Sequence, residues 1–578
     1  MTQHPQQIKS TTTVAHYLFT RLQQLGIESI FGVPGDYNLR LLDFVTPSGL
    51  HWVGNCNELN AAYAADGYAR IKGASALITT FGVGELSAIN GIAGAYAEKA
   101  AVVHIVGTPA RSLQDSRVLM HHTLADGEYR RFATMAQQVT VVQTNLVDPR
   151  TVPEQVDWAL KQAMVHSRPV YIEVPDDMVD EEVSATGLAK TIELPVDPEV
   201  GRDQEPMQQI LQRMYAAKRP MILVDGECRP LGIVEQTEKL IQTTGWPTWT
   251  TVFGKSLVNE DQPNVYGNYH GVVGSAEHKT YFETADLILI LGPHYTDTNT
   301  QAFTTIPRPS VTISFLPDRI DVCGTGTYRE SPRSFLSRLL QTLDSSRIPQ
   351  IPSLSRPIVE EEEKTTPIDP ASLIEQKTFY RFVNRLFRAG DLILTETGTA
   401  SHGGREFRLP PDTRLFGAVT WLSIGYMLPA TLGAALAQRE RKKDTDNNTR
   451  AILFIGDGSL QMTVQEISTM ISQNLNIVIF VINNSGYTIE RAIHGRKQAY
   501  NDVASWRHEQ ALGFFGARED QVANTFSART YQELETVLAD ERIQRGTGLR
   551  IIEVFMERED VQGVLLQLMN SQIAKERK

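Results

Sequence analysis

Short apolar runs alternate with stretches of helical periodicity along almost the whole chain. β-rich apolar runs of strand length include Ser29 to Val33, Ser75 to Thr80, Ala101 to Val106 and Val170 to Val174. Strands that alternate with helices in this way predict parallel sheets covered by helices. We therefore expect an α/β fold built from doubly wound parallel-sheet domains.

Two polar, proline-containing segments interrupt this alternation and divide the chain into three units. The predicted domains are residues 1–185, 205–344 and 371–578, with linkers at about 186–204 and 345–370. The second linker carries the acidic run Glu360 to Glu363, a composition typical of linkers. Units one and three contain similar late segments, Tyr171 to Val174 and Ile551 to Val554, which gives a weak indication of internal duplication.

Composition narrows the class of partner. The net charge is -12 and no long basic run occurs, which argues against nucleic acid or an anionic membrane as the main partner. Three cysteines do not make a disulfide framework, so we expect a reducing compartment, the cytoplasm. The polar stretch Met1 to Thr13 is not expected to be a signal peptide, and no run of about 18 apolar residues predicts a membrane span.

The strongest local signal follows two neighbouring predicted strands of the third unit. Ile455 to Ser459 reads IGDGS, and Asn483 to Gly486 reads NNSG. The carboxyl ends of neighbouring parallel strands are where open α/β sheets bind ligands, and glycines with exposed N–H groups suit a diphosphate. Asp457 and Asn484 offer oxygen ligands for Mg²⁺. GDGS alone could be only a tight turn, but the asparagine pair favours the binding site. The helix after GDGS is predicted to begin near Thr463.

A carboxylate stands at the start of a predicted helix over Asn57 to Arg70. Glu58 lies in its first turn, in line with a stripe of small residues, Ala61, Ala62 and Ala65. Such a stripe is typical of a face against which something packs closely, and a buried carboxylate there would need a partner. A first-turn glutamate that only complements the helix dipole is the alternative, and the helix alone favours it.

Five segments in order resemble one family, the thiamine-diphosphate-dependent 2-oxo acid decarboxylases, and most closely the fungal type of the pyruvate and indolepyruvate decarboxylase group. They are residues 31–38 (FGVPGDYN), 57–70 (NELNAAYAADGYAR), 121–124 (HHTL), 456–459 (GDGS) and 484–490 (NSGYTIE). The resemblance covers nearly the whole chain. It implies pyrimidine-binding, middle and diphosphate-binding domains, and a homodimer or homotetramer with active sites between chains.

The resemblance also implies roles for individual residues. Mg²⁺ would be held by Asp457, Asn484 and the backbone oxygen of Gly486, and Glu58 would bind the pyrimidine ring of the cofactor. Catalytic residues would be Glu58, Asp36, His121, His122 and Glu490. The remaining cofactor-binding residues would be Thr397, Gly398, Leu422, Ser423, Ile424, Gly456, Gly458, Ser459, Tyr487, Thr488 and Ile489. Ile424 would lie under the bent cofactor, although it could equally be an ordinary core residue.

The implied reaction is non-oxidative decarboxylation of a 2-oxo acid to an aldehyde and CO₂, through a thiamine-diphosphate ylid and a carbanion/enamine. The resemblance places Thr298, Ser401, His402, Ile489 and Ile493 around the substrate. Phenylalanines are typical of the family where this chain has Thr298 and His402, so we expect a wider, more polar pocket and a substrate longer or more polar than pyruvate. Leu422 stands where the fungal enzymes usually have glycine.

Glu227 falls where yeast-type enzymes carry the cysteine associated with substrate activation, and Cys228 follows it. We therefore predict weak or absent sigmoidal kinetics. Two other functions remain open. The enzyme could mainly join its intermediate to an aldehyde, as a carboligase, or the chain could be an inactive scaffold paralogue. Glu58, Asp457 and Asn484 are all present, which disfavours the scaffold.

Overall fold

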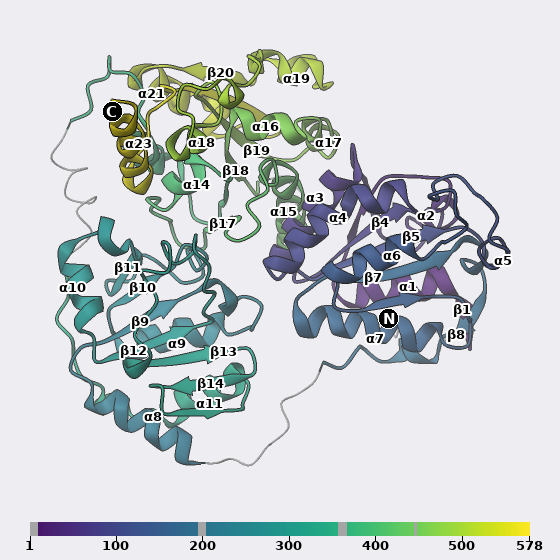
Figure 1. The fold of residues 1–578 in the computed structure, drawn as a ribbon, viewed down its shortest axis with the longest axis horizontal. Helices are drawn as coiled ribbons and strands as arrows, with labels where there is room; N and C mark the ends of the chain where they lie inside the picture. The colour runs from purple at the N-terminus through teal and green to yellow at the C-terminus, as the bar shows by residue number, and fades with distance from the viewer. Residues whose placement is uncertain (1–9, 195–203, 356–366, 444–447, 578) are drawn as a thin grey trace, which may run out of the picture.

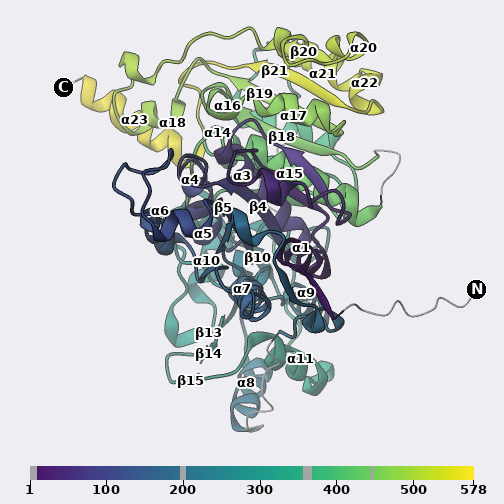
Figure 2. The same cartoon turned by 90° about the vertical axis from the view of Figure 1, so that its right-hand side faces the viewer.

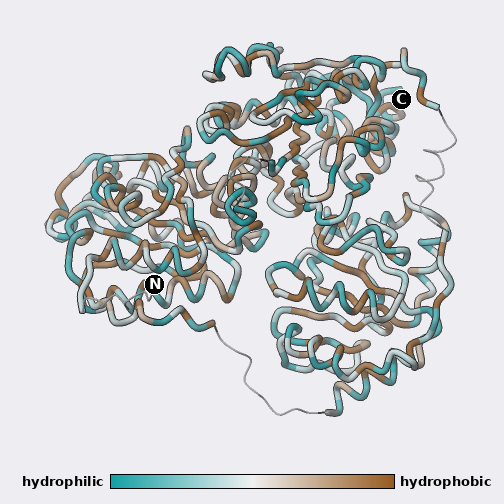
Figure 3. The backbone as a smooth tube through the Cα atoms, turned by 180° about the vertical axis from the view of Figure 1, so that it is seen from behind, coloured by the Kyte–Doolittle hydropathy of each residue, from teal (hydrophilic) through white to brown (hydrophobic). Residues whose placement is uncertain are grey.

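The computed structural model describes residues 10–194, 204–355, 367–443 and 448–577. Within these residues, three lobes each contain a β-sheet flanked by helices (Figure 1). Hydrophobic segments run through all three lobes, because strands buried on both faces are apolar along their length (Figure 3). The α/β class expected from the sequence is confirmed.

The first sheet is six-stranded and wholly parallel, in the order β3-β2-β4-β5-β7-β6. Its strands are β2 (Ser29–Gly32), β3 (His51–Gly54), β4 (Ser75–Thr80), β5 (Val102–Thr108), β6 (Gln143–Asn145) and β7 (Val170–Pro175). Its helices are α1 (Val14–Gln24), α2 (Leu39–Leu42), α3 (Glu58–Lys72), α4 (Val83–Ala97), α5 (Arg111–Asp115), α6 (Arg131–Ala136) and α7 (Val152–His166). A separate antiparallel pair joins β1 (Thr11–Thr13) to β8 (Glu182–Ser184).

The middle sheet has the order β11-β10-β9-β12-β13-β14-β15, and its last two pairings are antiparallel. Its strands are β9 (Pro220–Val224), β10 (Thr248–Thr250), β11 (Val265–Asn268), β12 (Leu287–Leu291), β13 (Thr312–Leu316), β14 (Arg319–Val322) and β15 (Gly326–Tyr328). The helices are α8 (Gln204–Ala216), α9 (Val234–Thr244), α10 (Ala276–Thr284) and α11 (Pro332–Thr342).

The third sheet is again six-stranded and parallel, in the order β17-β16-β18-β19-β21-β20. Its strands are β16 (Leu392–Thr395), β17 (Arg414–Gly417), β18 (Ala451–Gly456), β19 (Ile477–Asn483), β20 (Thr525–Ala528) and β21 (Leu549–Phe555). The larger helices are α13 (Gln376–Phe382), α14 (Thr399–Gly404), α15 (Met427–Lys442), α16 (Asp457–Thr463), α17 (Glu466–Ser472), α18 (Thr488–Ile493), α21 (Tyr531–Ala539) and α23 (Gly563–Glu576). Shorter helices are α19 (Ala511–Phe514), α20 (Glu519–Val522) and α22 (Glu541–Gln544).

The first and third sheets share one topology. Numbered along the chain within each sheet, both run in the order second, first, third, fourth, sixth, fifth strand. The similar segments Tyr171–Val174 and Ile551–Val554 both lie in the sixth strand, β7 and β21. The weak sign of internal duplication in the sequence therefore has a structural counterpart.

Helices α3 and α15 hold the first and third domains together, side by side in two views (Figures 1 and 2). The small residues of α3 permit this contact. A Cβ at Gly67 would overlap the backbone oxygen of Ala430, and one at Gly433 would overlap that of Ala64. One continuous apolar core consequently joins the two domains.

Of two helices predicted next to candidate site residues, one is confirmed and the other begins at a different residue. The helix predicted over Asn57 to Arg70 is α3, whose N-cap Asn57 accepts a hydrogen bond from the Asn60 N–H. The helix predicted near Thr463 begins earlier, because α16 starts directly at Asp457 and a second helix, α17, follows. No helix among the described residues combines the length and apolarity needed to cross a bilayer.

Candidate functional site

The carboxyl edge of the third sheet gathers the predicted cofactor-binding segments. β16 leads into Thr397 and Gly398, and its neighbour β18 leads into Asp457. From β16 the chain passes to β17 on one side of it, and from β18 it passes to β19 on the other side, so the strand order reverses between β16 and β18. Ligands of open α/β sheets bind in the crevice at such a reversal of strand order. Asn484, directly after β19, lies on the same edge.

Three oxygen atoms can converge between β18 and β19. In one orientation of the Asn484 amide, its oxygen lies 3.3 Å from Asp457 Oδ1 and 3.0 Å from the backbone oxygen of Gly486. In the other, its nitrogen donates to those two acceptors and its oxygen accepts from Thr488 Oγ1 at 2.9 Å. Neighbouring oxygens around octahedral Mg²⁺ lie about 3.0 Å apart. The first orientation thus matches a cation site, and the second satisfies the same groups without a cation.

The electrostatics of Asp457 agree with a cation site. Its side chain is buried, at 3% exposure, and burial raises its pKa to about 6. Hydrogen bonds from the N–H groups of Gly458, Ser485 and Gly486 and the charge of His508 oppose that rise. A buried carboxylate with so little compensating positive charge is stabilised by a bound cation.

Two glycines keep side chains out of this edge. A Cβ at Gly458 would stand 2.5 Å from the Tyr487 ring. Gly486 has a φ of 137°, a conformation that L-residues rarely adopt, and a Cβ there would overlap the backbone oxygen of Asn501. Both motifs that the sequence singled out therefore need their glycines for close backbone packing.

The loop that carries Leu422, Ser423 and Ile424 lies against this edge. Thr463 Oγ1 in α16 donates to the Gly425 backbone oxygen at 2.7 Å, and Ser423 Oγ lies 2.7 Å from the Tyr63 hydroxyl in α3. Leu422 has a φ of 52°, in the left-handed region that favours glycine. That conformation gives a reason for the glycine typical of the fungal enzymes at this place.

A buried glutamate that sequence reasoning missed holds the start of this loop. Glu98 is 1% exposed, and its Oε1 accepts hydrogen bonds from the backbone N–H groups of Val419, Thr420 and Trp421 at 2.8, 2.9 and 3.1 Å. Its Oε2 accepts one from Arg70 at 2.8 Å. These contacts hold the pKa of Glu98 below its usual value despite burial. No local signal in the sequence marks Glu98, because every hydrogen-bond donor to its carboxylate except Arg70 is more than 300 residues away.

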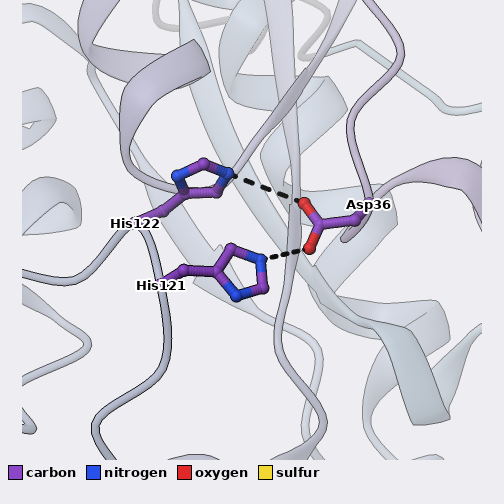
Figure 4. A group of neighbouring side chains, drawn as sticks. All are labelled: Asp36, His121 and His122. Atoms are coloured by element: carbon purple, nitrogen blue, oxygen red, sulfur yellow. Dashed lines mark hydrogen bonds and ion pairs between the residues drawn. The ribbon is translucent and has the colours of Figure 1, made fainter.

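Asp36, His121 and His122 form a cluster at the carboxyl edge of the first sheet (Figure 4). Asp36 Oδ2 contacts His121 Nε2, and Asp36 Oδ1 lies 3.7 Å from His122 Nε2. The Tyr37 ring stacks on His121 with centroids 5.0 Å apart. All three polar side chains are partly exposed, so the cluster can exchange protons with a ligand. The structure thus brings together residues that are 85 positions apart in sequence.

The buried carboxyl group of Glu85 holds Gly82, which packs against His122 of the cluster. Gly82 touches His122 closely enough that a Cβ at Gly82 would overlap the His122 backbone oxygen. The Gly82 N–H donates to Glu85 Oε1 at 2.8 Å, and the Tyr171 hydroxyl donates to Glu85 Oε2 at 2.7 Å. Burial raises the pKa of Glu85 to about 7. Sequence reasoning did not single out Glu85.

Glu58 and the Asp36 cluster do not reach the Asp457 segment within one chain. Glu58 is half-buried at the start of α3, and its Oε1 faces Gly84 at the start of α4. No hydrogen bond or ion pair found among the described residues joins Glu58 or the cluster to Asp457 or Asn484. Figure 1 shows α5, which precedes the two histidines, at the outer end of the first domain, whereas α16 and α18 lie in the third.

The predicted substrate residues are spread over several elements. Glu490 and Ile493 are exposed on α18, and Ile489 packs against an apolar cluster beneath it. The Thr298 hydroxyl donates to the backbone oxygen of Val419. The Nδ1 of His402 lies 3.0 Å from the Gly398 oxygen. Ser401, next to it on α14, is partly buried.

Comparison with known proteins decides the family. Three descriptions of one family match the chain in order: "Thiamine pyrophosphate enzyme, N-terminal TPP binding domain" over residues 12–129, "central domain" over 207–325 and "C-terminal TPP binding domain" over 396–554. The chain belongs to the thiamine pyrophosphate enzymes.

This thiamine pyrophosphate enzyme has close curated relatives. It is 52% identical to the pyruvate decarboxylase of Aspergillus parasiticus, with 98% of each chain covered. It is 39% identical to that of Kluyveromyces marxianus, with 95% of this chain and 96% of the relative covered. A thiamine diphosphate-dependent 4-hydroxybenzoylformate decarboxylase from Rhodococcus jostii RHA1 shares the fold, with a TM-score of 0.73, 18% identity and 94% and 99% coverage.

The third-domain edge of this thiamine pyrophosphate enzyme fits the family's cofactor, which is thiamine diphosphate with Mg²⁺. Three oxygens can converge on one point, and Asp457 is a buried carboxylate in need of positive charge. The donor set is hard oxygen, which is the chemistry Mg²⁺ prefers.

Proposed function

We propose that this enzyme converts a 2-oxo acid to an aldehyde and CO₂ without oxidation, using thiamine diphosphate and Mg²⁺. When bound, thiamine diphosphate supplies an electron sink for the bond that releases CO₂. The observation that carries the proposal is the pairing of Asp36 with two histidines in a chain whose third domain offers oxygen ligands for Mg²⁺. Decarboxylation to an aldehyde needs groups that deliver and remove protons, and this cluster is built for that task.

The proposed roles follow from where each residue lies. Asp457, Asn484 and the Gly486 backbone oxygen would hold Mg²⁺, and Glu58 would bind the pyrimidine ring. The cofactor would also contact the loop Leu422–Ile424 and the segment Tyr487–Ile489. Asp36 would orient the histidines, because its two oxygens face one imidazole each. Glu490, exposed on α18, would complete the proton-transfer set from the third domain.

The first test is a panel of 2-oxo acids from pyruvate to indolepyruvate, with the cofactor and Mg²⁺ present and aldehyde detected by a coupled reductase. Asp36→Asn keeps the shape of the side chain but removes the charge that faces both histidines. We expect a fall in kcat of roughly 10²–10⁴ with unchanged cofactor affinity. Asp43→Asn, at an exposed acid just after α2, is the matched control. Full activity of the Asp36→Asn enzyme would contradict the proposal.

We further propose a substrate longer or more polar than pyruvate. Support comes from Thr298 and His402, which stand where the family typically has phenylalanine, and the Thr298 hydroxyl bonds to a backbone oxygen in the loop before Leu422. Thr298→Phe should then narrow the pocket and raise kcat/KM for pyruvate relative to larger acids. Added aldehyde in the same assay distinguishes carboligation, because acyloin would then replace aldehyde as the main product.

We propose that the complete site forms between two chains of a homodimer or homotetramer. The support is that, within one chain, neither Glu58 nor the Asp36 cluster contacts the Asp457 segment. Mixing two inactive variants, Glu58→Gln and Asp457→Ala, should restore about a quarter of wild-type activity, since half of random dimers would carry one intact site of two. If mixing restores nothing while the chains do exchange, a site within one chain is indicated.

We propose a cytoplasmic location, on the ground that three cysteines make no disulfide framework. Fractionation of cells that express the tagged chain tests this location. Enrichment in an organelle fraction would contradict it.

A further inference from the structure

A cavity of about 720 Å³ lies where the middle domain, α14 and the first turn of α23 meet. Its volume is in the range of small-molecule sites. Of the residues assigned above to cofactor, metal, catalysis or substrate, only His402 lines it. The cavity is therefore not explained by the proposed reaction.

Two buried donors in its lining have no hydrogen-bond partner among the described residues. Asn268, at the end of β11, is 6% exposed; its Oδ1 accepts from Thr250 Oγ1 at 2.6 Å, but its Nδ2 donates to nothing. The Nε of Arg405, just after α14, is also buried without an acceptor. Buried donors in native proteins are nearly always paired, so an acceptor is expected to occupy the cavity.

The charge of the lining favours an anion. Burial lowers the pKa of Arg405 to about 10, so its guanidinium stays charged at neutral pH. Burial and the charge of Arg405 lower the pKa of His402 to about 4. Burial also lowers the pKa of His270, where the opposing charge of Glu406 only partly offsets it. Both imidazoles are therefore mainly neutral. Lys255 is balanced by Glu260 at 2.9 Å, and lysines and arginines outnumber carboxylates in the lining as a whole.

The first turn of α23 adds a third source of positive potential. Gln562, its N-cap, makes no capping hydrogen bond through its side chain, and the first turn contains no acidic residue. Gly563 and Val564 line the cavity, so the N-terminus of this 14-residue helix borders it. Such a terminus favours an anion. Together with the unpaired amide of Asn268, it forms a site with donors from two domains.

Part of the remaining wall is apolar and aromatic, formed by Tyr266, Tyr269, Phe407 and Leu566. We propose that the cavity binds an organic anion, with a carboxylate or phosphate head held by Arg405, Asn268 and the α23 terminus, and an apolar body against the aromatic walls. The ligand would touch α14, which directly follows Thr397 and Gly398, and α23, which packs on α18. Of the residues proposed for substrate, it would share only His402.

The test is calorimetric titration of the enzyme saturated with thiamine diphosphate and Mg²⁺. Phenyl phosphate and phenylacetate are the two probes, and inorganic phosphate and acetate are the same heads without the body. We expect one molecule of an aromatic anion per chain, bound at least tenfold more tightly than its bare head. The tighter of the two aromatic probes shows whether the head is a phosphate or a carboxylate.

Three variants make the result decisive. Arg405→Gln removes the charge, and Asn268→Asp keeps the acceptor for Thr250 but replaces the donor with a negative group, so each should weaken binding at least tenfold. Arg518→Gln, at an exposed arginine paired with Asp520, should change nothing. The proposal fails if Arg405→Gln binds as tightly as wild type, if an unreactive 2-oxo acid analogue displaces the probe, or if neither probe binds. Should Asn268→Asp misfold by circular dichroism, the Arg405→Gln arm decides alone.

Discussion

Replacing Glu98 by glutamine should both destabilise the protein and weaken cofactor binding. One Glu98 oxygen accepts three backbone N–H groups of the loop that precedes Leu422, and the other pairs with Arg70. Glutamine can still accept from the loop, but it then turns an NH₂ group toward the Arg70 guanidinium. Breaking a buried charge pair by removing one partner costs about 3–5 kcal/mol. Because Asp66 also contacts Arg70, we expect about 3 kcal/mol.

The second effect, weaker cofactor binding, tests whether Glu98 positions the Leu422–Ile424 loop in addition to stabilising the fold. The Leu422–Ile424 loop would contact the cofactor, so a displaced loop should weaken cofactor binding about tenfold, equivalent to about 1.4 kcal/mol. Asp391→Asn is the matched control, because Asp391 and Arg450 form an equally buried pair, 2.6 Å apart, at the opposite edge of the third sheet. It should lower stability comparably and leave the cofactor dissociation constant unchanged.

Urea denaturation of the apoenzyme and calorimetric titration of the cofactor measure the two effects. The pKa of Glu98 is lowered in the folded protein, so its contribution is complete above the unfolded value near 4.5 and disappears as pH falls through the folded pKa. The difference between wild type and Glu98→Gln should therefore be constant above pH 4.5 and shrink below it. A loss under about 1 kcal/mol, or a cofactor affinity equal to that of Asp391→Asn, would refute the reasoning.

Three further predictions concern other parts of the molecule. Burial raises the pKa of Glu85 from 4.5 to about 7, so wild type should lose stability relative to Glu85→Gln between pH 5 and pH 8, by roughly 2–3 kcal/mol in urea denaturation; a constant difference would speak against it. Gly433→Ala would push a Cβ into the Ala64 backbone oxygen and should cost about 1–3 kcal/mol or more, seen as a lower Tm. Glu227 stands where yeast-type enzymes carry the cysteine associated with substrate activation, and its carboxylate pairs with Lys99 at 2.6 Å. Without a thiol at this position, substrate saturation should be hyperbolic. A Hill coefficient well above one would contradict this.

Features that depend on local sequence were predictable. Asp457 and Asn484 follow strands whose apolar runs are plain, and strand ends fix where such residues lie in a parallel sheet. The helix at Asp457 was missed, because apolar periodicity at Val464, Ile467 and Ile471 marks mainly α17, whereas α16 is short and begins with polar residues and glycine. Periodicity cannot locate a helix that starts without an apolar face.

Features that depend on tertiary contact were not predictable from the residues alone. Nothing in the spacing of Asp36 and His121 indicates that they touch, and only resemblance to a family grouped them. Glu98 escaped notice because its main partners lie in another domain. The sequence shows that Leu422 departs from the glycine typical of the fungal enzymes. Only the folded loop shows its positive φ, the conformation that favours glycine.

The shared topology of the first and third sheets bears on why two chains would be needed. Each sheet places its polar residues at the carboxyl edge, beside the reversal of strand order: Asp36 after β2 in the first, and Thr397 and Asp457 after β16 and β18 in the third. The first edge carries the cluster of Asp36 with two histidines, proposed above for proton transfer, and the third carries oxygens suited to a metal. The packing of α3 on α15 fixes the two domains of one chain without joining these edges. On the proposal of a site between chains, each edge would hold half of the site, and a second chain would offer the missing half.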